Sequence, residues 1–123
     1  MTIRDAINRI DNLKHNVYSR SDKIAWLTRL DAEVKQQIID AHENSKRLIF
    51  AGYDEDTPED TELLIPCPYD DVYLKYLEAQ IDYYNGEYDK YNNAIVMFQA
   101  SMDVFTNYYR RTHMPKSTAI KYF

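Results

Sequence analysis

An apolar side chain recurs at alternating steps of three and four residues across the second half of the chain, and this spacing constrains the fold most. A repeat near 3.5 residues is typical of helices that pack lengthwise against other helices. Asn85 and Gly86 interrupt the series with residues that favour the left-handed conformation of helix ends. We therefore predict two helices, 69–84 and 88–112, folded back as an antiparallel hairpin, with one continuous helix as the alternative. The series consists of Leu74, Leu77, Ile81, Tyr84, Tyr88, Tyr91, Ile95, Phe98, Met102, Phe105 and Tyr109.

Two further helices are predicted in the first half of the chain. Thr2 and Asp5 have the spacing of a capping box at the start of the first helix. Ser19 or Ser21 caps the second, which carries an apolar stripe over 24–41. Only two glycines and four prolines occur in the 123 residues, which disfavours turn-rich sandwiches and barrels. The sequence therefore predicts a small all-α, four-helix domain that ends in a helical hairpin.

Two segments fall outside this helical pattern. At about 46–65 short apolar runs flank an acidic stretch, which predicts either an irregular flap or a short β-hairpin. After residue 112, Pro115 stops the last helix and a short basic tail ends in apolar residues. Because a free tail should be polar, this tail is expected to dock on its own domain or on a partner. We thus divide the chain into a helical domain at 1–112 and an extended arm at 113–123.

The charge of the chain is acidic overall and unevenly distributed. The formal net charge is −5 and the sequence pI is about 5.1, which argues against a dedicated nucleic-acid binder. Residues 48–90 hold two Lys or Arg and twelve Asp or Glu, whereas residues 91–123 hold four and one. An acidic middle and a basic end favour ordered association with neighbouring molecules.

No motif in the sequence indicates a reaction or a bound ion. The six carboxylates at 54–62 follow Gly52 and are interrupted by a proline, unlike a calcium loop of the EF-hand type, so we interpret them as a solvated acidic loop. The three histidines lack zinc-motif partners, and Cys67, between two prolines in an acidic region, is expected to be a passive, buried thiol. We therefore expect no enzyme activity, no metal and no cofactor. No stretch approaches the length of a membrane span.

Tyrosine is the residue that points to protein contacts. It takes seven of the 23 positions from Tyr69 to Tyr91. Tyrosine buries a large ring and keeps a hydroxyl that tolerates water, so it is enriched at interfaces together with arginine. These rings cannot all lie on the apolar face of one helix, and some are expected to meet another subunit. The predicted subunit interface comprises Tyr69, Tyr73, Tyr76, Tyr83, Arg110 and Arg111.

Several stretches of the second half resemble a known family. The segments "TELLIP", "PYDD", "YLEAQID", "NGEYDKYNNA" and "YYRRTHMP" look like the C-terminal half of small head-to-tail connector (adaptor) proteins of tailed bacteriophages and prophages. The likeness spans about 60–115, and the N-terminal helices fit the same layout more loosely. It lies in the placement of helices and aromatic residues, without a catalytic signature.

The resemblance implies a ring of about twelve copies beneath the capsid portal, in the neck of the virion, after assembly in the host cytoplasm. One end of the ring would meet the portal and the other a stopper or tail-completion protein, and DNA would pass without specific binding. The acidic loop would face this lumen or the next subunit through Asp54, Glu55, Asp56, Glu59 and Asp60. The arm would dock on the portal through Pro115, Lys116, Ile120, Lys121, Tyr122 and Phe123. The alternatives are a monomeric helical adaptor or regulator, and a tail-completion or terminator subunit.

Overall fold

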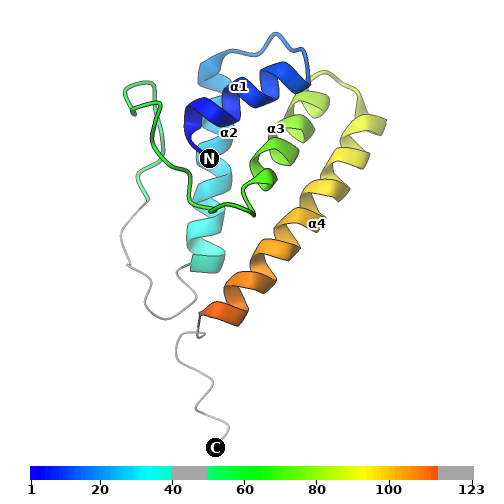
Figure 1. Cartoon of the computed structure of the whole chain (residues 1–123). Helices are drawn as coiled ribbons and strands as arrows, with labels where there is room; N and C mark the ends of the chain where they lie inside the picture. Colours follow the sequence, from blue (N-terminus) through cyan, green and yellow to red (C-terminus); the bar gives the residue numbers. More distant parts are fainter. Residues whose placement is uncertain (40–49, 114–123) are drawn as a thin grey trace, which may run out of the picture.

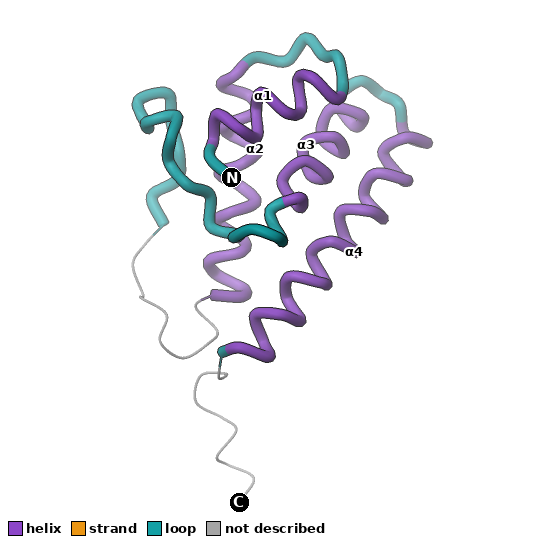
Figure 2. The backbone as a smooth tube through the Cα atoms, in the orientation of Figure 1, coloured by secondary structure: helices purple, strands orange, loops and turns teal. Residues whose placement is uncertain are grey.

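The computed structural model describes residues 1–39 and 50–113, and within them it is an all-α protein. Figure 1 shows the four α-helices, and no strand occurs in the described residues (Figure 2). Helices make up 68% of these residues, which confirms the predicted fold class. None of the described helices has the length and apolarity needed to cross a bilayer. The helices are α1 (Ile3–Leu13), α2 (Arg20–Val34), α3 (Asp71–Tyr84) and α4 (Tyr88–Thr112), and a π-helical turn, η1 (Lys35–Ile39), continues α2.

The first two helices begin where the sequence predicts. The Asp5 backbone N–H donates to the Thr2 hydroxyl at 3.1 Å, and the Asp5 carboxylate accepts from the Thr2 N–H at 3.3 Å. Ser19 and Asp22 form the same reciprocal pair at the start of α2, so Ser19 and not Ser21 is the cap. Each capping box satisfies backbone donors that a helix start leaves without partners.

The second half forms the predicted helical hairpin and not one continuous helix. Gly86 adopts a φ of +76°, which an L side chain rarely adopts, and the chain reverses there between α3 and α4. The turn also breaks the apolar series, because Tyr84 and Tyr88 are 50% and 61% exposed. Helix α3 starts at Asp71, later than the predicted residue 69, because a turn precedes it in which the Tyr69 N–H donates to the Pro66 carbonyl.

The core lies between α1, α2, α3 and one face of α4. Ile3, Leu27 and Leu77 are each fully buried, and Phe105 is the large α4 side chain that completes this core. Only Ala94 and Phe105 are buried along α4, whose opposite face is exposed. The fourth helix therefore packs mainly against α3, with a single narrow stripe.

The segment between α2 and α3 is irregular where the structure describes it. Residues 50–69 wrap along α1 and α2 and contain no strand (Figure 2). Thr2 and Glu62 form an isolated bridge, and the Ile3 N–H donates to the Thr61 carbonyl at 3.1 Å. Of the two predicted forms, the described part of the flap is thus the irregular one. Residues 46–49 of the flap and 114–123 of the arm lie outside the described residues.

Candidate protein-interaction surfaces

A buried carboxylate fixes the flap to the helices. Asp31 of α2 is fully buried, and its Oδ1 accepts from the Tyr73 hydroxyl of α3 at 2.7 Å. Its Oδ2 accepts from the Tyr53 hydroxyl at 2.5 Å and from the Leu64 N–H at 3.2 Å. The Tyr73 hydroxyl also accepts from the Ile65 N–H at 2.7 Å. Two helices and both ends of the flap therefore meet in one hydrogen-bonded network.

Burial in this network shifts the pKa of its ionisable side chains. Burial raises the pKa of the Asp31 carboxyl, while its hydrogen bonds to Tyr53, Tyr73 and Leu64 act in the opposite direction. Burial, and after it the negative charge of Asp31, raises the pKa of Tyr53 and of Tyr73. Both phenols therefore remain protonated hydrogen-bond donors throughout the neutral range.

A close backbone contact holds the first part of the flap on α2. The Thr28 hydroxyl accepts from the Tyr53 N–H at 3.0 Å and donates to the Tyr53 carbonyl at 3.2 Å. Gly52, with a φ of +85°, precedes this contact, and a β-carbon there would lie 2.9 Å from Thr28 Cγ2. Glycine is thus required at this position for its conformation and for its size. The acidic loop therefore begins from a segment that is held against α2.

The acidic loop divides into carboxylates that hold the loop and carboxylates that face solvent. Asp54 Oδ1 accepts from the N–H groups of Asp56 and Thr57, a turn typical of aspartate. Glu59 pairs with Arg4 of α1 at 3.3 Å and with Arg20 of α2 at 3.0 Å, and Glu55 accepts from Ser21.

Asp56 and Asp60 are the carboxylates of this loop that remain available to a partner. Both are exposed, and neither side chain makes an ion pair or hydrogen bond with the described residues. No group of three or more potential metal-ligating side chains occurs among the described residues. Lumen or neighbour contacts of the loop would therefore fall to Asp56 and Asp60, because Glu55 and Glu59 already have partners within the subunit.

The two predicted interface arginines lie at the C-terminal end of α4. Arg110 and Arg111 are exposed in its last turn, where positive charge is favoured by the helix dipole. Neither forms an ion pair with a carboxylate of the described residues. Tyr69 lies half-buried nearby and stacks on Tyr108 with ring centroids 4.5 Å apart. Within residues 1–39 and 50–113 the two arginines therefore have no ionic partner, whereas the Tyr69 ring is stacked on Tyr108.

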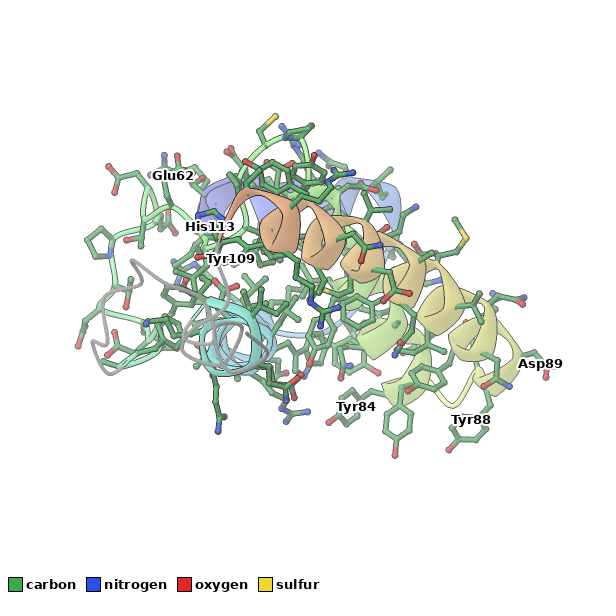
Figure 3. All side chains as sticks on the ribbon, turned by 90° about the horizontal axis from the view of Figure 1, so that it is seen from below. Glu62, Tyr84, Tyr88, Asp89, Tyr109 and His113 are labelled. Atoms are coloured by element: carbon green, nitrogen blue, oxygen red, sulfur yellow. The ribbon has the colours of Figure 1, made fainter. Side chains whose placement is uncertain are left out.

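An aromatic cluster covers the opposite end of the molecule, at the α3–α4 turn. The Tyr84 ring stacks on Trp26 of α2 with ring centroids 5.5 Å apart, and the Tyr83 ring meets the rings of Tyr84, Tyr88 and Tyr91 edge to face. Tyr83 is 48% exposed. Figure 3 shows Tyr84 and Tyr88 at this end and His113 at the other. Tyr83, Tyr84 and Tyr91, with Arg29 and Gln80, line an open pocket of about 340 Å³.

A second buried carboxylate joins α1 to the helical hairpin. Asp82 of α3 is 1% exposed, and Lys14 Nζ lies 2.5 Å from its Oδ1. This oxygen has no well-directed hydrogen bond, so its pairing with Lys14 rests on charge. The pair borders an open groove of about 280 Å³ between α3 and α4, to which Lys75 and Lys90 also contribute.

The observed exposure of three side chains corrects predictions made from the sequence. Tyr73 and Tyr76 are 0% and 8% exposed, so neither ring is available to another subunit as predicted. Tyr73 is held inside by Asp31, and Tyr76 packs against Phe98 of α4 with ring centroids 5.2 Å apart. Cys67, expected to be buried, is exposed, because the turn between its flanking prolines lies on the surface.

Asp31 was missed from the sequence although a signal was present. It lies four residues after Leu27 and three before Val34, so the helical repeat places its carboxylate on the apolar face of α2. A charge on such a face indicates a buried partner, although the spacing does not identify Tyr53 and Tyr73. Comparison with protein-family models, with curated proteins and with solved structures finds no match to this chain.

Proposed function

We propose that this chain is a structural subunit of a bacteriophage neck, forming a ring that joins the portal to the tail or to a stopper protein. DNA would pass through this ring without specific binding. The resemblance of residues 60–115 to head-to-tail connectors suggests the role. The observation that carries it is the separation of two complementary charged groups on one subunit: the acidic pair Asp56 and Asp60, and the arginine pair Arg110 and Arg111.

These two groups lie on different parts of the surface. The acidic loop lies beside α1 and α2, and α4 lies on the opposite side of the molecule (Figure 1). Identical subunits whose complementary patches are distinct associate head to tail, and such contacts close into a ring when the rotation permits. Opposite charges at the contact orient the subunits and suppress wrong pairings. The free arginines of one subunit would therefore meet the free aspartates of the next.

Charge reversal tests this contact directly. The assay is the amount of protein that sediments with portal-bearing heads of the same phage at low salt. Reversing the arginine pair (Arg110→Glu with Arg111→Glu) should reduce capture, and so should reversing the acidic pair (Asp56→Lys with Asp60→Lys). The chain that carries all four changes regains complementarity between neighbours and should regain capture. Arg9→Glu, an exposed charge reversal on α1, serves as the control for a reversal outside the proposed contact.

The outcome separates a ring from the alternatives. Failure of the fourfold variant to recover, with each pair variant folded by circular dichroism, would contradict the head-to-tail contact. A monomeric adaptor would be captured at one copy per site and would show no rescue by the second reversal. A tail-completion subunit would bind heads only after the neck is present.

The arm is tested separately by deletion of residues 114–123. If the arm docks on the portal, the shortened chain should lose capture by portal-bearing heads while its helix content stays unchanged. Unaltered capture would refute the docking role of the arm without affecting the contact between subunits.

A further inference from the structure

Helix α4 carries a second stripe that faces solvent, which we call the outer face of α4. At 100° per residue, nine side chains fall within about 60° of Ala100 on the helix surface. All nine are exposed, in contrast to the half-buried or buried residues of the opposite face. Val96, Met97 and Val104 are 64%, 53% and 58% exposed. The outer face consists of Asp89, Asn93, Val96, Met97, Ala100, Asp103, Val104, Asn107 and Arg111.

The order of residues on this face is nearly symmetric about Ala100. Four residues on either side of Ala100 lie Val96 and Val104. Seven residues away on either side lie Asn93 and Asn107. The symmetric positions eleven residues away carry opposite charges, Asp89 in the first turn and Arg111 in the last. Figure 3 shows Asp89 at the far end of α4 from His113, so the two charged ends are well separated.

We propose that the outer face of α4 binds the same face of a second copy of this chain, with the two helices antiparallel and a two-fold axis passing beside Ala100. In this arrangement Val96 of each copy packs against Val104 of the other. Asn93 faces Asn107, two amides that can hydrogen-bond to each other. Each Asp89 faces an Arg111, and the antiparallel helix dipoles are favourable.

The small side chain at the centre makes close packing possible. Val96, Ala100 and Val104 form a ridge at four-residue spacing, the kind of ridge that interdigitates with its counterpart on another helix. Ala100, at the crossing point, allows the two backbones to approach. Met97 and Asp103 lie at the edges of the stripe, where Asp103 remains in contact with water. One helix per subunit gives a small interface, so the dimer is weak and depends on concentration.

The partner of the outer face of α4 is a second copy of this chain, because the residues of that face complement one another when two copies lie antiparallel. An isologous contact requires that each residue meet its symmetry mate, and the charges at the two ends satisfy this requirement for an antiparallel pair. The inference does not rest on the proposed ring. Ring contacts are heterologous and never bring Ala100 of one subunit against Ala100 of the next. Because Arg111 would serve both contacts, the dimer is a form of the free subunit that competes with the ring.

Cysteine cross-linking tests the axis. In a Cys67→Ser background, Ala100→Cys places one thiol per chain beside the axis, within the Cα separation of roughly 4.4–6.8 Å that disulfides span. With a mild oxidant, this variant should form covalent dimers at least about tenfold faster than Gln99→Cys, whose exposed position lies about 100° away around the helix. Equal rates for the two variants would overturn the proposal.

Reversal of the charges of Asp89 and Arg111 tests the two ends of the proposed interface, and sedimentation velocity at low salt measures dimer formation. Asp89→Arg and Arg111→Asp each replace two attractive pairs by two repulsive ones, so each variant alone should dimerise about tenfold more weakly than the wild type. An equimolar mixture restores both attractive pairs in the heterodimer and should recover the wild-type association. A wild-type chain that stays monomeric up to about millimolar concentration would overturn the proposal, as would a mixture no stronger than its components.

Discussion

Replacing Tyr73 by Phe removes one hydroxyl from the network around Asp31 and leaves the buried ring in place. Two groups lose a partner in this variant. The Ile65 N–H loses its acceptor at 2.7 Å, and Asp31 Oδ1 loses its donor at 2.7 Å. Both partners belong to fully buried residues, so water does not readily replace the lost hydroxyl.

The expected effect is large for the deletion of one oxygen atom. A buried polar group without a partner costs roughly 1–3 kcal/mol, and more when it is charged. For the two groups together we expect the free energy of unfolding to fall by about 2–5 kcal/mol. Domains of this size are stable by about 5–15 kcal/mol, so the variant should fold with a clearly lower midpoint.

The assay is urea unfolding at neutral pH, followed by circular dichroism. Tyr69→Phe is the matched control, because the Tyr69 hydroxyl makes no hydrogen bond among the described residues and its ring stays stacked on Tyr108. The free energy of unfolding of this control should lie within about 0.5 kcal/mol of the wild-type value. The reasoning would be refuted if Tyr73→Phe unfolded at the same urea concentration as Tyr69→Phe.

Three further outcomes follow from the same structure. Because the pKa of Tyr53 and of Tyr73 is raised in the folded protein, their contribution to stability is complete below the ordinary tyrosine pKa near 10 and is lost as the pH rises through the raised values. In an alkaline titration, the last tyrosines to ionise, followed by absorbance, should therefore do so together with unfolding, followed by circular dichroism. Gly52→Ala should lower the melting temperature more than Gly86→Ala, since both have positive φ but only Gly52 has a side chain in the way; equal shifts would contradict this. Cys67 should react fully with a thiol reagent in the native protein, and reaction only in denaturant would show that it is buried.

Local signals in the sequence were enough to place the helices. The capping pair at Thr2, the choice of Ser19 or Ser21 as the second cap, and the glycine at 86 all concern local backbone conformation. The structure has caps at Thr2 and Ser19 and a positive φ at Gly86. These signals favour the hairpin over one continuous helix, because the three- and four-residue spacing on either side of Gly86 gives two apolar stripes that can bury each other.

The buried tyrosines could not be separated from the exposed ones by sequence alone. Tyr76 and Tyr83 lie seven residues apart, and therefore on the same side of α3, yet they are 8% and 48% exposed. Tyr76 packs against Phe98 of α4, which is 22 residues away along the chain. Contacts over such a separation depend on how α3 and α4 pack, and no local spacing encodes that.

The most direct test of the proposed ring is electron microscopy of purified portal particles mixed with an excess of the full chain. The proposed function predicts a second ring stacked coaxially on the portal, with the loop around Asp56 of each subunit against Arg110 and Arg111 of its neighbour. Portal particles that stay bare, or that carry scattered single copies with no contact between them, would contradict it.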